Sequence, residues 1–201
     1  HCLYADVCGG CPWQHLDYDA QLEAKRAHVV NALVRTAHLD ADLVETLVPP
    51  CEPSKRQWGY RNKIELQGAR DEHGQFQLGF AKAGSHEVFT PDVCPVAVKP
   101  IQKVPKALRG ALRFAQGSDD LGIFRAGVRG SLRTKDVEVA LWTPPGAFPR
   151  AHIANTIKSA VKNTSVVRVI ADPGKARKVK NVECLSGKGC WEETLGDVRF
   201  L

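Results

Sequence analysis

The sequence contains no methionine, no long apolar run, no low-complexity tract and no internal repeat. Because a natural start codon would supply a methionine, we expect this 201-residue chain to be a piece of a longer protein. No apolar run approaches the roughly 20 residues that a membrane-spanning helix needs, and no signal peptide is visible. These absences predict a cytoplasmic protein with no membrane partner, and we expect it to be monomeric.

The composition is that of a globular protein, with 43% hydrophobic and 25% charged residues. The net charge of +6 is unevenly distributed along the chain. Residues 1–50 carry three basic and seven acidic side chains, whereas residues 99–135 carry nine basic and two acidic ones. A concentrated basic excess favours a polyanion partner, because each neutralised phosphate releases condensed counterions. The alternative is a solvated basic surface without a partner.

Three cysteines crowd the start of the chain, where Cys2, Cys8 and Cys11 stand in the spacing Cys-x5-Cys-x2-Cys. The total of seven cysteines is odd, so a fully paired disulfide framework would leave one over. In a reducing compartment, clustered cysteines more often bind metal than form disulfides. Glycines 9 and 10 let the backbone turn tightly and aim two sulfurs at one centre. The stretch therefore predicts a metal site.

Three thiolates at one point require a fourth ligand. The candidates are Cys51, Cys94, Cys184 and Cys190, with His1 and His15 as less favoured choices. The spacing alone accommodates either tetrahedral zinc or an iron–sulfur cluster, since both accept four cysteines. A disulfide or bystander thiols are a further alternative.

Hydrophobic periodicity predicts an α+β fold with an antiparallel or mixed sheet, two or three amphipathic helices and a cysteine-ligated cluster loop. Antiparallel hairpins are favoured over a parallel sheet. We expect a helix over about 20–37, with Asp19 as N-cap and its apolar residues along one face, and a second helix over 148–163 with its apolar face inward. We expect strands within 43–48, 121–130, 136–143 and 165–171, a β-meander over 60–91, and weaker strands near 181–185 and 197–201.

A one-signed basic stripe is predicted on a helix within residues 99–113. At 100° per residue its cations fall within about a 120° arc, opposite an apolar side. Pro105 either starts this helix or kinks it. The cations of the stripe are Lys99, Lys103, Lys106, Arg109 and Arg113. Phosphate contact and a bland solvated face are equally compatible with this pattern.

Further candidates for RNA contact lie on predicted strands. Arg125 and Arg129 share one side of a strand with Gly127 between them, and this glycine either permits a close backbone approach or marks a bulge. Arg61 and Lys63 would share a face with Glu65, an arrangement that folding alone also explains. The loop 174–181 is basic, and it is either a flexible clamp for phosphate or merely a soluble loop.

Three aromatic residues of this part of the chain, Trp13, Trp58 and Tyr60, could stack on unpaired bases. Aromatic rings beside a metal cluster more often shield it from solvent. We favour the shielding role for these three residues.

Several of these residues together form a recognisable pattern. The chain reads C-x5-CGGC-x-WQHL-x-Y-x-x-QL-x-x-K, then W-x-YRNK, then LGF at 78–80 and a later cysteine. The matching positions are Cys2, Cys8, Gly9, Gly10, Cys11, Trp13, Gln14, His15, Leu16, Tyr18, Gln21, Leu22, Lys25, Trp58, Tyr60, Arg61, Asn62 and Lys63. This pattern closely resembles the RNA uracil-5-methyltransferase family, in particular its cluster-containing members that act on 23S ribosomal RNA. The match is dense over 1–94 and looser over 95–201.

The resemblance implies a [4Fe-4S] cluster held by Cys2, Cys8, Cys11 and Cys94, an RNA substrate, and S-adenosylmethionine as the methyl donor of the parent enzyme. Methyl transfer moves no net electrons, so a structural role for the cluster fits best. It would tie the first cysteines to Cys94 across 82 intervening residues, and closing so long a loop restricts the unfolded chain strongly.

Methylation of uracil C5 needs a cysteine nucleophile that adds at C6, a carboxylate base and a glycine-rich cofactor loop. The chain shows none of these convincingly, because Gly187 and Gly189 lack the flanking strand and helix of a cofactor loop. We therefore expect residues 1–201 to be a central iron–sulfur and RNA-recognition domain, with its cluster loop at 1–18 plus 91–95. The family's N-terminal β-barrel (TRAM) domain and its C-terminal methyltransferase domain would lie outside the chain.

Two other classes of protein remain open as alternatives. One is a stand-alone zinc-stabilised module that binds nucleic acid without an attached enzyme. The other, a secreted domain held by disulfides, is disfavoured by the odd cysteine count. Under the leading interpretation, the 201-residue chain is catalytically inactive on its own.

Overall fold

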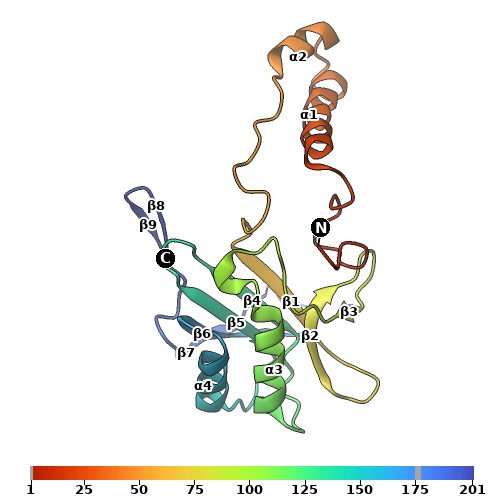
Figure 1. Ribbon diagram of the computed structural model, residues 1–201. Coiled ribbons are helices and arrows are strands. Elements are labelled where there is room, and N and C mark those ends of the chain that lie inside the picture. Colours follow the sequence, from red (N-terminus) through yellow and green to blue (C-terminus); the bar gives the residue numbers. More distant parts are fainter. Residues whose placement is uncertain (1, 175–177) are drawn as a thin grey trace.

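A seven-stranded sheet forms the centre of the computed structural model, which describes residues 2–174 and 178–201 (Figure 1). The strand order is β3-β2-β1-β4-β5-β6-β7, and β8 and β9 form a separate hairpin. The strands are β1 Lys63–Arg70, β2 Phe76–Ala81, β3 Val88–Phe89, β4 Arg125–Gly130, β5 Val137–Thr143, β6 Thr164–Ile170, β7 Asn181–Ser186, β8 Glu193–Leu195 and β9 Val198–Phe200. The helices are α1 Tyr18–Arg35, α2 Ala41–Leu47, the 3-10 turn η1 Lys99–Ile101, α3 Val104–Gln116 and α4 Arg150–Ala160.

The sheet is mixed, as predicted, because β5 and β6 pair in parallel while the other neighbours pair antiparallel. A parallel pair needs a crossover connection, and α4 supplies it between these two strands. The β-meander predicted over 60–91 is confirmed as β1, β2 and β3.

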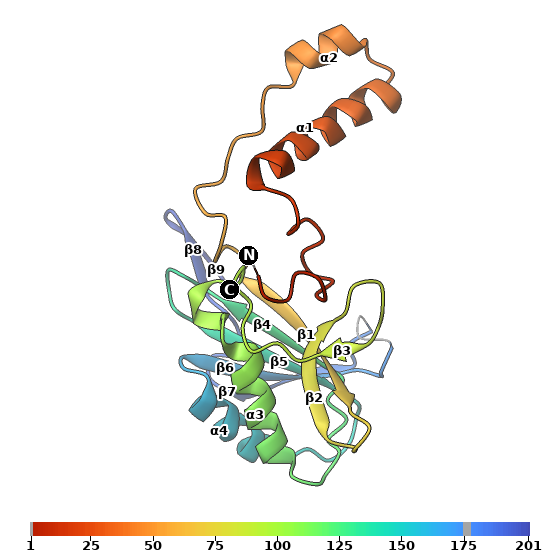
Figure 2. The ribbon, with the colours of Figure 1, turned by 45° about the vertical axis from the view of Figure 1, so that its right-hand side comes forward.

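One face of the sheet is covered by α3 and α4 (Figure 2). Alternation places Ile64 and Leu66 of β1 on that face, where they are 3% and 0% exposed. Leu108 of α3 and Ile153 of α4 are fully buried in the same core. Pro105 starts α3 rather than kinking it, since it lies in the first turn, where a missing N–H costs nothing.

The first two helices form a hairpin that projects away from the sheet (Figures 1 and 2). The helix predicted over 20–37 is confirmed as α1, although it contains no buried residue and Val29 is 50% exposed. The N-cap position is occupied by Asp17 rather than Asp19, which lies in the first turn. The periodicity thus predicted a helix correctly, but no part of the core packs against this helix.

The strand predicted within 43–48 is also wrong, because α2 occupies this segment. Asp40 caps it by accepting a hydrogen bond from the backbone N–H of Leu43 at 3.0 Å. Arg26 of α1 then holds the hairpin together by donating to the carbonyl of Val48 at 3.0 Å and pairing with Glu45 at 2.5 Å. A short apolar run does not distinguish strand from helix, and here the cap and the neighbouring helix decide.

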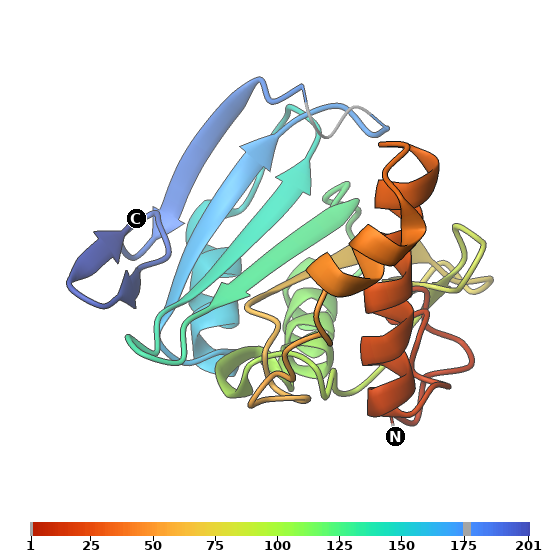
Figure 3. The same ribbon diagram turned by 90° about the horizontal axis from the view of Figure 1, so that it is seen from above.

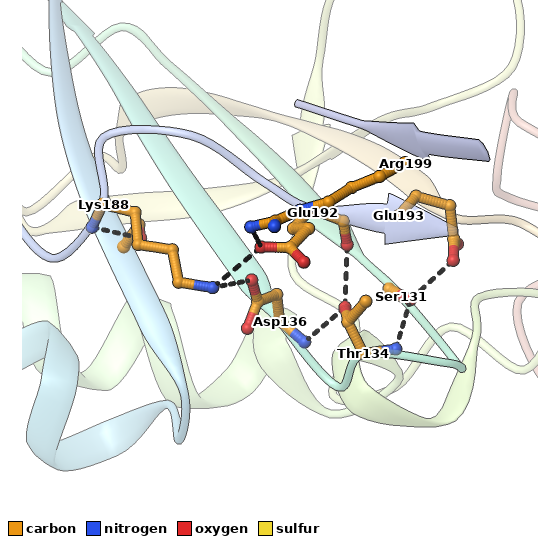
Figure 4. A network of polar contacts seen from close by, with 8 residues as sticks. Ser131, Thr134, Asp136, Lys188, Glu192, Glu193 and Arg199 are labelled. Carbon is orange, nitrogen blue, oxygen red and sulfur yellow. Dashed lines mark hydrogen bonds and ion pairs between the residues drawn. The ribbon is translucent and has the colours of Figure 1, made fainter. Parts of the chain in front are cut away.

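The hairpin β8–β9 is attached to the sheet by a polar network (Figure 4). Lys188 pairs with Asp136 at 2.9 Å and with Glu192 at 3.1 Å. The Ser131 hydroxyl donates to a Glu193 oxygen at 2.9 Å, and Arg199 of β9 pairs with Glu192 at 2.8 Å. These contacts tie the hairpin to the β4–β5 turn. Among the helices of the described ranges, none is both long and apolar enough to cross a bilayer.

Candidate metal-cluster site and nucleic-acid surfaces

The cysteine-rich loop at the start of the chain folds as a series of turns against the edge of the meander. The backbone N–H of Cys8 donates to the carbonyl of Tyr4 at 2.8 Å, and that of Gly9 donates to the carbonyl of Ala81 at 3.2 Å. Cys8 and Lys82 form an isolated β-bridge. The loop is therefore fixed to the end of β2 by its backbone.

Cys94 lies in a second loop between β3 and η1, and it is only 8% exposed. Its backbone N–H donates to the carbonyl of Gln102 at 2.9 Å, which closes the loop. The hydroxyl of Tyr4, on the first loop, accepts the backbone N–H of Asp92 at 3.2 Å. This bond joins the two cysteine loops across 88 positions of sequence.

All four cysteines predicted as cluster ligands line one cavity. Apolar groups also line it, and they include Tyr4, Phe80, Phe89 and Val96. The lining cysteines are Cys2, Cys8, Cys11 and Cys94. The other candidates, Cys51, Cys184, Cys190 and His15, are not among the lining residues, and His1 lies outside the described residues. The structure thus brings together the four thiols that the family pattern selects.

The charges around this cavity suit thiolate ligands. The Arg61 guanidinium donates to the carbonyl of Gly10 at 3.0 Å and to the sulfur of Cys11 at 3.9 Å. The backbone N–H of Gly10 points to the sulfur of Cys8 at 3.4 Å. Burial raises the pKa of the Cys8 and Cys94 thiols, and the positive charge of Arg61 opposes that rise. A metal would have to displace these thiol protons on binding.

Within residues 2–174 and 178–201, no group of three or more His, Cys, Asp or Glu side chains stands in a position to hold a metal ion. The four cysteines thus line one cavity without forming such a group.

The aromatic residues that line the cavity differ from those expected. Tyr4, Phe80 and Phe89 line it. Trp58 and Tyr60 instead are 42% and 52% exposed and line a groove beside the start of α1, together with Tyr18. Trp13 does not line the cavity either, and its ring centroid lies 5.6 Å from that of His28. Sequence spacing could not reveal the lining phenylalanines, because β2 and β3 bring them in from the meander.

The basic stripe predicted on one helix is divided, because Lys99 lies on η1 and Lys103 precedes α3. The part of the stripe on α3 has intramolecular partners. Lys106 and Arg109 both pair with Asp92, at 2.7 and 2.9 Å, and Arg109 is largely buried. Arg113 donates to the carbonyl of Phe76 at 2.6 Å. The stripe thereby braces the Cys94 loop and β2. Lys99 and Lys103 are exposed.

Of the predicted strand residues, Lys63, Arg125 and Arg129 lie on the other face of the sheet, whereas Arg61 precedes β1 and contacts the first cysteine loop. Lys63 and Arg125 both pair with Glu65, the former at 2.5 Å. Gly127 marks no bulge, since the pairing of β4 with both neighbours runs through it without a shift. Gly127 leaves room for the ring of Trp142, because a Cβ atom at this position would lie 3.0 Å from that ring.

Two site features escaped the sequence analysis. Arg125 stacks on Trp142, with its guanidinium carbon 4.9 Å from the ring centroid, and Arg129 lies 5.9 Å from the centroid of Trp191. The strand register would have been needed to find these pairs. Of the basic loop 174–181, residues 175–177 lie outside the described part of the chain.

No family model matches the chain. Among curated proteins, an RNA methyltransferase of Halalkalibacterium halodurans is 32% identical over an alignment of 208 positions, which covers 99% of this chain and 44% of that protein. One of Synechocystis is 40% identical over 95 residues, covering 47% of the chain and 20% of that protein. One of Staphylococcus aureus is 33% identical over 112 residues, covering 56% and 24%. All three are described as uncharacterized RNA methyltransferases.

Among solved structures, the tRNA (uracil-54, C5)-methyltransferase of Pyrococcus abyssi, in complex with S-adenosyl-L-homocysteine, shares the fold of the chain. The TM-score is 0.65 at 22% identity, over 96% of this chain and 44% of that one. The curated relatives that the chain resembles are all RNA methyltransferases by description. Together with the shared fold, they agree with the resemblance to the RNA uracil-5-methyltransferase family that the motifs carry. The chain spans less than half the length of each of these proteins.

Proposed function

We propose that this chain is the iron–sulfur and RNA-recognition part of an S-adenosylmethionine-dependent RNA (uracil-C5) methyltransferase that acts on 23S ribosomal RNA. The observation that carries the proposal is the convergence of Cys2, Cys8, Cys11 and Cys94 on one cavity. Three of these side chains come from the first loop, which is held by the end of β2, and Cys94 comes from the loop before η1. Cysteines from two segments that line one cavity form the kind of donor set that a metal cluster requires.

The donor set fits a [4Fe-4S] cluster. In such a cluster each thiolate binds a different iron atom, so the sulfurs surround a larger core than they would around one zinc ion. The apolar rings of Phe80 and Phe89 keep the site away from water, while Arg61 supplies positive charge beside Cys11. When bound, the cluster supplies four metal–sulfur bonds that cross-link the two loops.

The residues around the cluster then set the geometry of the RNA-facing parts. Arg61 fixes the first cysteine loop through Gly10, and Asp92 connects the second loop to α3 through Lys106 and Arg109. The loops and α3 thereby form one unit. We propose that RNA contacts the exposed cations next to this unit, including Lys99 and Lys103.

The methyl-transfer step itself is proposed to take place outside residues 1–201. A structural neighbour that binds S-adenosyl-L-homocysteine supports S-adenosylmethionine as the methyl donor of the whole protein. The sequence of this chain shows no convincing nucleophile, base or cofactor loop for the reaction. The chain alone should therefore bind RNA without methylating it.

The test is metal analysis of protein purified without oxygen. We expect about four iron and four acid-labile sulfide per chain, and we expect the variant Cys184→Ser to retain them because Cys184 does not line the cavity. One zinc ion and no sulfide would overturn the cluster and favour a zinc-stabilised nucleic-acid-binding module instead.

A further inference from the structure

The sheet has one face without helices. Figure 3 shows β4, β5 and β6 uncovered from above, while α3 and α4 lie on the far side. This face carries Arg125, Gly127 and Arg129 of β4, opposite Trp142, Ala140 and Glu138 of β5 in register. A sheet face that keeps large aromatic and basic side chains needs an explanation beyond core packing.

The first part of this surface is a stacked pair. The ring of Trp142 extends over Gly127, where any side chain would collide with it. The guanidinium of Arg125 lies on the ring at 4.9 Å and is held from the side by an ion pair with Glu65. The Arg125 side chain is 28% exposed. Arg125 is therefore fixed on a flat aromatic base and remains accessible.

A second pair lies along the same strand. Arg129 lies 5.9 Å from the centroid of Trp191, and the residue itself is exposed. The backbone N–H of Trp191 opposes the rise in the pKa of Glu138 that burial causes, so Trp191 lies beside this residue of β5. Because residues 125 and 129 are four apart on one strand, the two arginines point to the same face.

Both tryptophans have an unusual polar environment. Among residues 2–174 and 178–201, the only buried side-chain nitrogen or oxygen atoms without a hydrogen-bond partner are the indole nitrogens of Trp142 and Trp191. Buried donors without partners cost folding free energy. The two rings thus sit on this face at a cost to the fold, as is common at functional surfaces.

The charge of the face favours an anion only weakly. Lys63, Arg125 and Arg129 are balanced in part by Glu65 and Glu138. Planar groups rather than excess charge therefore distinguish this surface. An open groove lined by Glu65, Lys82 and His86 continues from it toward Gly9 and Gly10 of the cysteine loop.

We infer that the helix-free face of the sheet binds unpaired RNA by stacking of bases on the Arg125–Trp142 and Arg129–Trp191 pairs. This inference rests on the proposed function and specifies the form of RNA that the domain recognises. Unpaired bases expose their faces to aromatic rings and guanidinium planes, whereas a duplex hides them. Arg125 is already held over Trp142 and by Glu65, so its guanidinium pays little further ordering cost on binding a base.

The experiment measures the affinity of the chain for a single-stranded oligouridine and for a base-paired RNA of the same length. We expect tighter binding of the oligouridine and quenching of tryptophan fluorescence. Arg125→Lys and Arg129→Lys keep the charge but remove the planar group, so each should weaken oligouridine binding about tenfold. Arg35→Lys, on exposed α1, is the matched control and should bind like the wild type.

The outcomes separate the two proposals. Unchanged oligouridine affinity in both lysine variants would overturn the stacking surface and leave RNA recognition by this domain intact. Failure of the wild-type chain to bind either RNA would overturn both the surface and the RNA-recognition role. The cluster would still be judged by metal analysis. Because both substitutions are at accessible positions and conserve charge, we expect thermal unfolding midpoints close to the wild type, and this is checked alongside binding.

Discussion

Arg61 reaches across 50 positions of sequence to place its guanidinium 3.9 Å from the sulfur of Cys11. It does so from the segment just before β1, where its backbone N–H donates to Val96 at 2.8 Å and its carbonyl accepts from Val98 at 2.8 Å. One residue thus joins the first cysteine loop to the segment that follows Cys94. Arg61, predicted from the sequence to contact RNA, has its partners within the protein.

Replacing Arg61 should weaken retention of the proposed cluster. Groups that orient and charge-balance metal ligands typically contribute about 10–100-fold to metal affinity, so we expect Arg61→Met to lose iron at least about tenfold faster to a chelator. Arg61→Lys keeps the charge but not the bond to Gly10 and should be intermediate. The rate is followed by iron release, and identical rates in all three proteins would contradict this role.

Cys94→Ser should remove the proposed cluster and lower the free energy of unfolding of the chain, because the link between the two loops is lost. Cys184→Ser provides the comparison, since Cys184 is exposed and outside the cavity. Iron content and thermal unfolding midpoint are measured for both. Normal iron in Cys94→Ser would move the fourth ligand to another cysteine.

The two exposed lysines beside the Cys94 loop should contribute to RNA binding through phosphate contacts. Lys99→Gln and Lys103→Gln should each weaken RNA binding and reduce the slope of log affinity against log salt by about 1. Lys106→Gln should have a smaller effect, because Asp92 already neutralises Lys106. Binding isotherms at several salt concentrations provide the measurement. Equal slopes in all variants would show that these cations stay solvated.

An ion-pair cluster outside the cysteine cavity should make stability depend on pH. Arg150, and after it Arg168, lowers the pKa of Glu183 in the folded state. Arg168 is 1% exposed and Glu183 pairs with Arg150 at 2.7 Å. A carboxyl group whose pKa is lower in the folded state stabilises the folded state fully at pH values above its unfolded pKa, about 4.3. This stabilisation is lost as the pH falls through the folded pKa.

Glu183→Gln should therefore unfold at a lower temperature than the wild type at neutral pH. The gap between the two midpoints should narrow below about pH 4. Any effect of acid on a bound cluster acts on both proteins, so the difference reports on the carboxylate. A gap that stays constant down to pH 3 would contradict the assigned pKa shift.

Local patterns predicted much of the fold and less of its long-range arrangement. The meander and the strands at 125–130 and 137–143 follow from alternation, and the four cavity cysteines follow from the family pattern. The α2 segment was too short for periodicity to decide, and the exposed side of α1 depends on what packs against it. Trp142 over Gly127 depends on register between strands, which no single strand contains.

Every residue that lines the cysteine cavity comes from the first 96 positions, and none comes from β4 to β7. Local opening of the edge formed by β2 and β3 can therefore expose the cavity while the rest of the sheet stays paired. In amide hydrogen exchange, removal of a bound metal should deprotect Ala83, Cys94 and their neighbours, whose N–H bonds close the two loops. The amides of β5 and β6 should keep their slow exchange, so the molecule would lose its metal site without losing its sheet.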